Sequence, residues 1–298
     1  MTVAAPREYG HFIDGSWREP SSAARIDVVN PATGELLARV PAGESVVRPR
    51  SRCPRCGAAI AWYDNVPVVS WLLLRARCRR CRAPISARYP LVELLGAGAA
   101  IAAWARHGLS LAALVELAFA ALLLALSFID VDTWTLPNAL TWPLLALGLA
   151  AAALGVGPAP SLASSAAGAG IGFAVLALVA WGSTALARRA GRIAADQEAF
   201  GFGDVWLYAG LGAFLGAAAL LPVLLLASIQ GAVAGVVLLL AGRAATGEKD
   251  GRGPVYEDGS VPPRASVPFG PFLALGALEW LWVGGALASA IPLLRAFR

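Results

Sequence analysis

Two aspartates, Asp130 and Asp204, stand at the ends of apolar stretches and could work as a pair. Asp130 ends the run Ser-Phe-Ile-Asp, and Asp204 ends Gly-Phe-Gly-Asp, directly before another apolar run. Gly201 and Gly203 lack side chains, so an extended peptide backbone can approach the second aspartate closely. Peptide hydrolysis by two carboxyl groups needs one ionised to activate water and one protonated to polarise the carbonyl, and close like charges favour such a shared proton. The pattern predicts an aspartyl peptidase, with the proton assigned to neither residue.

Nucleophilic chemistry with a histidine base is poorly supported. The chain has only two histidines. His11 lies in a polar N-terminal stretch. His107 lies in a short loop between apolar runs, where we expect a solvated side chain.

Four cysteines form two Cys-x-x-Cys pairs, at Cys53 and Cys56 and at Cys78 and Cys81, with 21 residues between the pairs. This spacing suits a four-cysteine tetrahedral zinc site, which would organise a polar loop that has little core of its own. A redox pair or free thiols are the alternatives.

The elements that position these groups are long apolar runs. The chain is 58% hydrophobic and 14% charged, whereas soluble domains carry about 25% charged residues. From Tyr89 onward we predict about seven transmembrane helices, and a split at Pro222 because residues 205–241 are too long for one span. The expected spans are 89–106, 109–129, 138–156, 163–187, 205–220, 222–241 and 269–292.

Arginine placement predicts the topology. Residues 48–88 hold ten arginines, and short loops this rich in arginine stay in the cytoplasm, where they can also meet lipid headgroups. Alternating the helices from there puts Asp130 and Asp204 at the cytoplasmic face. The same rule explains the net charge of +5, so we expect no nucleic-acid partner. Glu93, just inside the first helix, is an intramembrane acid and therefore a candidate functional residue.

From about residue 44 onward the chain resembles the type IV prepilin peptidases. The resemblance is carried by several motifs in order. They are Cys-Pro-Arg-Cys (53–56), Asn-Val-Pro-Val-Val-Ser-Trp-Leu (65–72), Cys-Arg-Arg-Cys (78–81), Ile-Ser-Ala-Arg-Tyr-Pro-Leu-Val-Glu (85–93), Ile-Asp with Leu-Pro-Asn (129–138), Glu-Ala-Phe-Gly-Phe-Gly-Asp (198–204) and Pro-Phe-Gly-Pro (268–271).

This resemblance implies a bacterial inner-membrane enzyme that cleaves prepilin or pseudopilin leader peptides just after a glycine, at the cytoplasmic face. It also implies N-methylation of the new N-terminus, with S-adenosylmethionine as methyl donor, and a place in type IV pilus or type II secretion systems. The family's catalytic residues fall on Asp130 and Asp204, with Asp132 a weaker alternative to Asp130. Glu93 and Glu198, within matched motifs, are expected to support the site.

The chain departs from the family at two places. Trp206 stands where the family usually has lysine, and the family's usual first membrane helix is expected to be missing. Residues 1–43 instead resemble the extreme N-terminus of aldehyde dehydrogenases and are expected to form short strands with turns at 14–15 and 30–31. We therefore expect three parts: this non-membrane arm (1–43), an arginine-rich four-cysteine loop (44–88) and a transmembrane peptidase domain (89–298).

Two other functions stay open from the sequence. One is an inactive fusion product that keeps the fold. The other is a membrane scaffold or transporter with a zinc-bearing loop. A transporter is expected to show internal repeats and helices interrupted near the middle of the membrane, and no clear repeat is present.

Overall fold

The computed structural model describes residue 53, residues 55–191, 201–240 and 267–297, and five short strands before residue 42. The chain divides into two compact units, Met1–Pro90 and Leu91–Arg298. Each unit is described by itself.

The first unit begins with short strands, as expected for the arm. β1 (Arg7–Glu8) pairs parallel with β5 (Leu36–Pro41), β5 pairs antiparallel with β4 (Arg25–Val29), and β2 (His11–Ile13) pairs antiparallel with β3 (Ser16–Arg18). The two expected turns, at 14–15 and 30–31, lie outside the described residues. The cysteine-bearing segment follows, with the 3-10 helix η1 (Trp62–Asn65) and the short helix α1 (Val69–Leu73).

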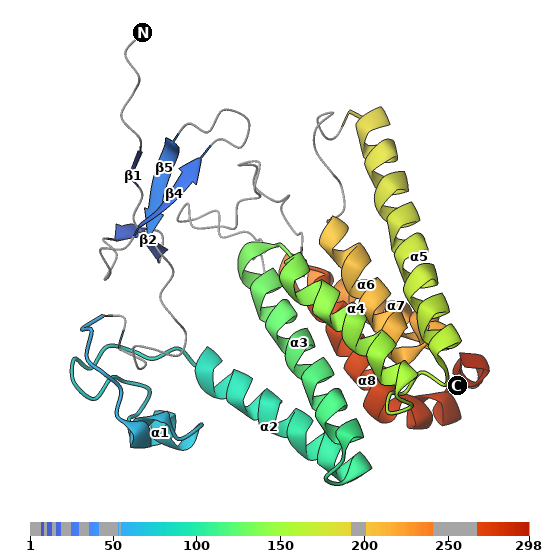
Figure 1. Cartoon of the computed structure of the whole chain (residues 1–298), viewed down its shortest axis with the longest axis horizontal. Helices are drawn as coiled ribbons and strands as arrows, with labels where there is room; N and C mark the ends of the chain where they lie inside the picture. The colour runs from blue at the N-terminus through green and yellow to red at the C-terminus, as the bar shows by residue number, and fades with distance from the viewer. Residues whose placement is uncertain are drawn as a thin grey trace. The chain divides into compact units, whose positions relative to one another are not determined.

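The second unit is a helical bundle, in which each predicted apolar run has become a helix (Figure 1). The helices are α2 (Arg88–His107), α3 (Leu111–Thr133), α4 (Asn138–Ala153), α5 (Leu162–Arg189), α6 (Phe202–Leu215), α7 (Leu220–Leu240) and α8 (Gly270–Ala290).

The count of seven membrane spans is not confirmed. Among the described residues, four helical segments are long and apolar enough to cross a membrane, namely Leu111–Thr133, Leu162–Arg189, Ala217–Leu240 and Gly270–Ala290. α4 and α6 are apolar but shorter, and α2 carries arginines at both ends and a glutamate. An all-α, polytopic membrane domain is therefore supported for the second unit, with fewer full-length spans than the apolar runs predicted.

The predicted split at Pro222 is wrong. The chain breaks at Gly216, which has a φ of +87°, and the short 3-10 helix η2 (Ala217–Ala219) leads into α7. Pro222 is the third residue of α7. Proline is tolerated in the first turn of a helix, where its missing N–H has no intrahelical partner, whereas glycine adopts positive φ without steric cost.

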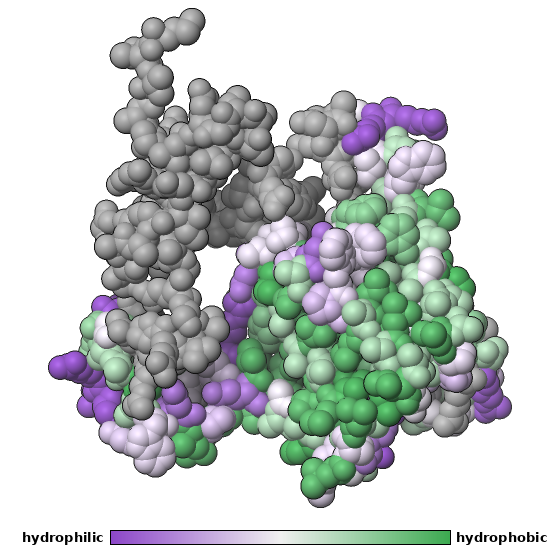
Figure 2. All heavy atoms as spheres, viewed as in Figure 1, coloured by the Kyte–Doolittle hydropathy of each residue, from purple (hydrophilic) through white to green (hydrophobic). Residues whose placement is uncertain are grey.

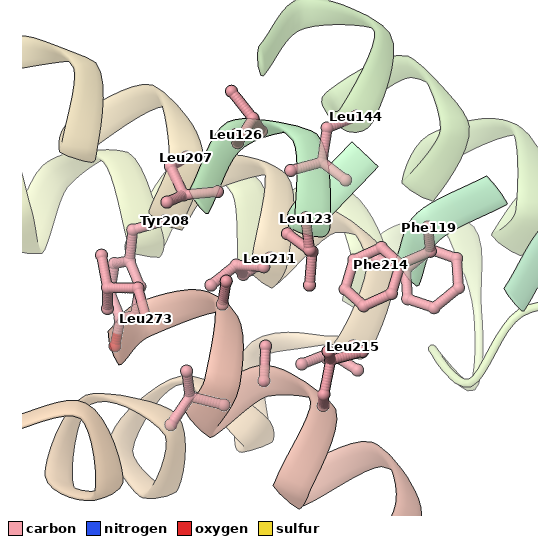
Figure 3. Packing of buried hydrophobic residues seen from close by; sticks show 14 of the residues in the cluster. Phe119, Leu123, Leu126, Leu144, Leu207, Tyr208, Leu211, Phe214, Leu215 and Leu273 are labelled. Atoms are coloured by element: carbon pink, nitrogen blue, oxygen red, sulfur yellow. The ribbon is translucent and has the colours of Figure 1, made fainter. Parts of the chain in front are cut away.

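α6 is the central helix: Val205 and every residue from Leu207 to Leu215 are buried, and Trp206 is half-buried. The rings of Phe119 and Phe214 stack at 3.8 Å between α3 and α6 (Figure 3). Two buried hydroxyls join α6 to its neighbours: Ser165 donates to the carbonyl oxygen of Ala213 at 2.6 Å, and Tyr208 donates to that of Leu220 at 2.6 Å. The bundle is thus packed around a short helix that lipid hardly reaches.

One buried acid, Glu116 of α3, joins three helices at the end of the bundle where α2 meets α3. Its carboxylate accepts hydrogen bonds from Arg106 at 2.9 Å and from the indole of Trp282 at 2.9 Å, and His107 Nε2 lies 2.8 Å from it. His107 is exposed, as expected, but the expectation that it lies in a loop is wrong. His107 is the last residue of α2 and contacts a buried carboxylate.

Candidate functional site

Asp130 lies in the last turn of α3, and its side chain is buried. Its Oδ2 accepts a hydrogen bond of 3.0 Å from the backbone N–H of Gly270, at the start of α8. Gly270 has no side chain, and a methyl group there would stand 2.6 Å from that same oxygen. The Pro-Phe-Gly-Pro motif thus brings the positive end of a helix dipole to the first aspartate.

Leu136 packs between the two glycines of the site. A methyl group at Gly203 would stand 2.7 Å from Cβ of Leu136, and one at Gly270 would stand 3.3 Å from its Cδ1. Leu136 itself is 9% exposed. The connection between α3 and α4 therefore sets the spacing between the beginning of α6 and the beginning of α8.

Asp204 lies in the first turn of α6, where the helix dipole favours a carboxylate. Its neighbour Gly203 abuts Leu136, which also abuts Gly270 beside Asp130, so the two aspartates lie on either side of this one leucine. Oδ1 of Asp204 is buried and has no hydrogen-bond partner in the part of the chain that the structure describes. A buried acceptor without a donor costs free energy, so this oxygen is suited to a ligand or a shared proton.

Taken together, α3 ends at the pair while α4, α6 and α8 begin beside it. One carboxyl group is held by a backbone N–H and the other has a free oxygen, which is the asymmetry that acid–base work by two carboxyls requires. Gly201, in front of α6, is exposed, and a methyl group there would stand 3.7 Å from Oδ2 of Asp204. Both predicted glycines therefore adjoin the pair.

The other predicted residues lie as follows. Asp132 is exposed, one turn or less from Asp130. Glu93 is half-buried on α2, and its supporting role stays a prediction. Glu198 lies outside the described residues.

Gly270 and Leu136 were not singled out from the sequence, although both belong to quoted motifs. The signal that could have identified Gly270 is a glycine beside a proline at a helix start, where a missing side chain points to close approach by another group. Glu116 could have been identified as an acid inside an apolar run.

The four cysteines form a second candidate site. Their sulfur atoms all lie within 4.8 Å of one another, and the Sγ atoms of Cys53 and Cys81 are 3.8 Å apart. Tetrahedral zinc with Zn–S bonds of about 2.3 Å places its sulfur ligands about 3.8 Å apart. The geometry of this cluster therefore fits zinc.

Each cysteine pair is held in the same kind of turn. The N–H of Cys53 donates to Ala58 at 2.9 Å, and the N–H of Cys78 donates to Ala83 at 2.8 Å. The residue after each pair has positive φ, and in the second turn this residue is Arg82, at 61°. Two matched turns facing each other present four thiols to one point.

Backbone N–H groups near the sulfur atoms favour the thiolate form, which binds a metal cation. The backbone N–H of Cys81, first among several donors, lowers the pKa of the Cys78 thiol to about 6, and the N–H of Cys56 leads those that lower the pKa of Cys53. For Cys81, the N–H of Ala83 acts to lower the pKa, but desolvation and the other three thiols raise it to about 11. Metal binding requires thiolates, and the first two shifts favour them.

Two protein-family models match the chain. A family model described as "Bacterial Peptidase A24 N-terminal domain" matches residues 31–107, and one described as "Type IV leader peptidase family" matches residues 117–236. The first match begins inside the arm, so it extends further toward the N-terminus than residue 44. The resemblance of residues 1–43 to aldehyde dehydrogenases stays a prediction.

Curated relatives cover most of the chain. A "Prepilin leader peptidase/N-methyltransferase" of Myxococcus xanthus (strain DK1622) is 39% identical over 304 residues, covering 86% of this chain and 88% of the relative. Proteins of the same name from Burkholderia pseudomallei (strain 1026b) and Aeromonas hydrophila are 40% and 41% identical, covering 85% and 78% of this chain and 74% and 72% of the relatives. No solved structure matches the chain.

Proposed function

The chain belongs to the type IV leader peptidase family, and we propose that it is a membrane aspartyl endopeptidase that cleaves prepilin-type leader peptides with Asp130 and Asp204 as its catalytic pair. The observation that supports this assignment is that Asp130, at the end of α3, and Asp204, at the start of α6, lie on either side of Leu136, beside the Gly270 N–H that holds Asp130. An enzyme of this kind needs no nucleophilic side chain.

The chemistry follows from the two carboxyl groups. The ionised carboxylate removes a proton from water while the water oxygen adds to the peptide carbonyl carbon. The protonated carboxyl donates a hydrogen bond to the carbonyl oxygen and stabilises its developing charge. The tetrahedral intermediate then breaks its C–N bond, and the leaving amine takes a proton from the pair. That transfer returns the pair to its single shared proton, and the products can then leave.

The relatives are also named N-methyltransferases, and we extend this second activity to the chain. The new N-terminal amine is the methyl acceptor. S-adenosylmethionine is the proposed donor substrate, whose sulfonium methyl passes to the amine nitrogen with loss of one amine proton. We assign no residues to this step.

The four cysteines are proposed to hold a structural zinc ion, because their sulfur spacing and backbone donors suit one. Bound zinc would cross-link the two turns and hold the loop folded. The segment is joined directly to α2, and its arginines are proposed to lie on the cytoplasmic side of a bacterial inner membrane. Residues 1–43 are proposed as a non-membrane arm, with no role in the chemistry.

The test is leader cleavage of a prepilin peptide by purified protein in detergent. Asp130→Asn and Asp204→Asn keep the size of each side chain but remove its acid–base function, so we expect each to lower kcat by about 10²–10⁴-fold. Asp132→Asn is the matched control and should cleave at nearly the parent rate. Circular dichroism and thermal melting establish that all three variants are folded.

Two outcomes would overturn the assignment. Loss of cleavage in Asp132→Asn with retention in Asp130→Asn would move the first catalytic position to Asp132. A folded parent protein that cleaves no prepilin peptide would favour the zinc-bearing membrane scaffold or an inactive fusion product.

A further inference from the structure

The depth of the carboxylate pair in the bundle follows from its neighbours, beginning with α5. α5 runs antiparallel to α6, and a methyl group at Gly172 would stand 2.8 Å from the carbonyl oxygen of Tyr208. Asp204 precedes Tyr208 by about one turn, so it lies level with Leu176 of α5. α5 reaches Arg188 some 12 residues later, about 18 Å further on at 1.5 Å per residue. Figure 1 shows α5 extending well past the start of α6.

α7, like α5, extends beyond the level of the aspartate pair toward the same side of the bundle. It runs antiparallel to α8, and a methyl group at Gly276 would stand 3.3 Å from the backbone nitrogen of Ala227. α8 begins six residues nearer the pair, at Gly270, while α7 continues 13 residues beyond Ala227, to Leu240. α7 therefore extends past the start of α8 by about seven residues, or about 10 Å.

Both extensions are apolar on their exposed sides. Trp181 is 75% exposed and Leu240 is 84% exposed. The first charged residues on α5 after the level of the pair are Arg188 and Arg189, and Figure 2 shows hydrophilic residues gathered at that end of α5. The large apolar side chains exposed on the extensions are Leu178, Val179, Trp181 and Leu186 of α5 and Val236, Val237, Leu239 and Leu240 of α7.

The opposite end of the bundle gives a second estimate of how deep the aspartate pair lies in the membrane. The side chains of Arg106 and His107, which bind Glu116, are 36% and 30% exposed, and partly exposed ionisable groups belong at a membrane boundary or in water. From residue 116 to residue 130 there are 14 residues of α3, about 21 Å. The hydrocarbon layer is about 30 Å thick. The Glu116 cluster and the carboxylate pair therefore cannot both lie at its two boundaries.

The extension of α7 agrees with the measure from the Glu116 side, and the longer α5 places Arg188 and Arg189 beyond the same boundary. About 21 Å from the Glu116 cluster to the pair and about 10 Å from the pair to the end of α7 together make one hydrocarbon thickness. We infer that Asp130 and Asp204 lie about 10 Å inside the hydrocarbon boundary on their side of the membrane, beneath walls formed by α5 and α7 whose outer faces contact lipid acyl chains.

This placement defines the form of the substrate, a step that rests on the proposed function. A scissile bond that must descend about 10 Å below the boundary needs about three residues in extended conformation, at about 3.3 Å each. A helix delivers only 1.5 Å per residue and has its carbonyls occupied by internal hydrogen bonds. The peptide class that fits is one whose cleavage-site segment is unwound where it enters the membrane.

The test measures depth directly, in the full-length protein reconstituted into lipid vesicles. Single cysteines are introduced at Val236 and Leu178, which lie between the level of the pair and the inferred boundary, and are spin-labelled. Ile229 in the middle of α7 is the deep reference, and Leu109, 97% exposed between α2 and α3, is the water reference. Parent protein treated in the same way corrects for labelling of native thiols.

Collision rates with oxygen and with a water-soluble nickel chelate give the depth of each label. We expect the oxygen-to-nickel ratio at Val236 and Leu178 to resemble that at Ile229 and to exceed that at Leu109 several-fold. Ratios at Val236 and Leu178 that resemble Leu109 would overturn the inference. Leader cleavage is measured on the parent protein in the same vesicles, so failure of the proposed function is distinguished from failure of the depth assignment.

Discussion

Gly270 is positioned so that its main-chain atoms, and no side chain, meet the carboxyl group of Asp130. In Gly270→Ala the new methyl group would stand 2.6 Å from Oδ2, and the carboxyl group must rotate or shift to relieve that contact. We expect kcat for leader cleavage to fall about 10²-fold, since misplacement of a catalytic group by about 1 Å has that effect. KM and the thermal midpoint should stay near the parent values. Steady-state kinetics in detergent measure kcat and KM, and thermal melting measures the midpoint.

Gly235→Ala is the control for this substitution, because a methyl group at Gly235 meets nothing within 4 Å. It should cleave at the parent rate. If Gly270→Ala also retains the parent kcat, the position of Asp130 does not depend on the small size of residue 270.

The sequence indicates the two aspartates well because each stands where an apolar run meets a polar loop. It does not indicate which main-chain group holds them. The bond from Gly270 to Asp130 joins positions 140 residues apart, and only folding brings them together. Leu136, which contacts both glycines, is one apolar residue among many in the sequence.

At the scale of elements, the contact between α5 and α6 depends on two glycines that face each other. A methyl group at Gly168 would overlap the carbonyl oxygen of Gly212, and one at Gly212 would overlap that of Gly168. Close backbone approach of this kind is common where helices pack in lipid. α6 therefore lies nearer to α5 than ordinary side chains permit.

We expect Gly168→Ala to destabilise the protein by about 1–3 kcal/mol, because an extra methyl group in a packed interface forces the backbones apart. Gly170→Ala, two residues along the same helix, is the matched control, since a methyl group there meets nothing within 4 Å. The thermal midpoint of purified protein in one detergent measures the difference. Equal midpoints for the two variants would contradict the close contact.

The cysteine turns make a separate prediction. The parent protein should carry about one zinc ion per chain, as expected for one four-cysteine site. Cys78→Ser should lose most of this zinc, because serine does not supply a thiolate ligand. Elemental analysis of purified protein measures the ion. Hydrogen exchange over residues 53–90 should become faster in the variant, and zinc retention with unchanged exchange would exclude this cysteine as a ligand.

Helix positions followed from the apolar runs to within a few residues, because a continuous apolar run of about 20 residues has few other uses. The number of full-length spans could not be predicted in this way, because the length of an apolar run does not show where a helix ends. Gly216 ends α6 after 14 residues, inside a run that reads as uninterrupted in the sequence. Nor does the pattern show that most of α6 is shielded by protein, which depends on the packing of its neighbours.

At the scale of the whole molecule, the Glu116 cluster fastens α2, α3 and α8 at the end of the bundle farthest from the aspartates. Glu116→Gln keeps the shape but removes the charge that Arg106 and His107 contact. We expect a loss of stability on the order of 1–2 kcal/mol, reduced by the partial exposure of both partners. kcat for the folded fraction should change little, since the cluster lies about 21 Å from Asp130.

Trp282→Phe refines this prediction, because it removes one hydrogen bond to Glu116 and keeps an aromatic ring. Its thermal midpoint should fall less than that of Glu116→Gln. A Glu116→Gln variant as stable as the parent would show that the three helices are held by apolar packing alone.

The short, enclosed helix α6 also bears on how the chain is made. A segment of 14 residues, ten of them buried, is too short to cross the bilayer alone, so we expect it to be unstable in lipid until its neighbours are in place. Gly216 and the short η2 connect α6 directly to α7, so we expect the two helices to enter the bilayer together as one hairpin. Because α6 packs mainly against α4 and α5, we expect it to reach its final position only once those helices are present, so that Asp204 meets Asp130 late in biogenesis.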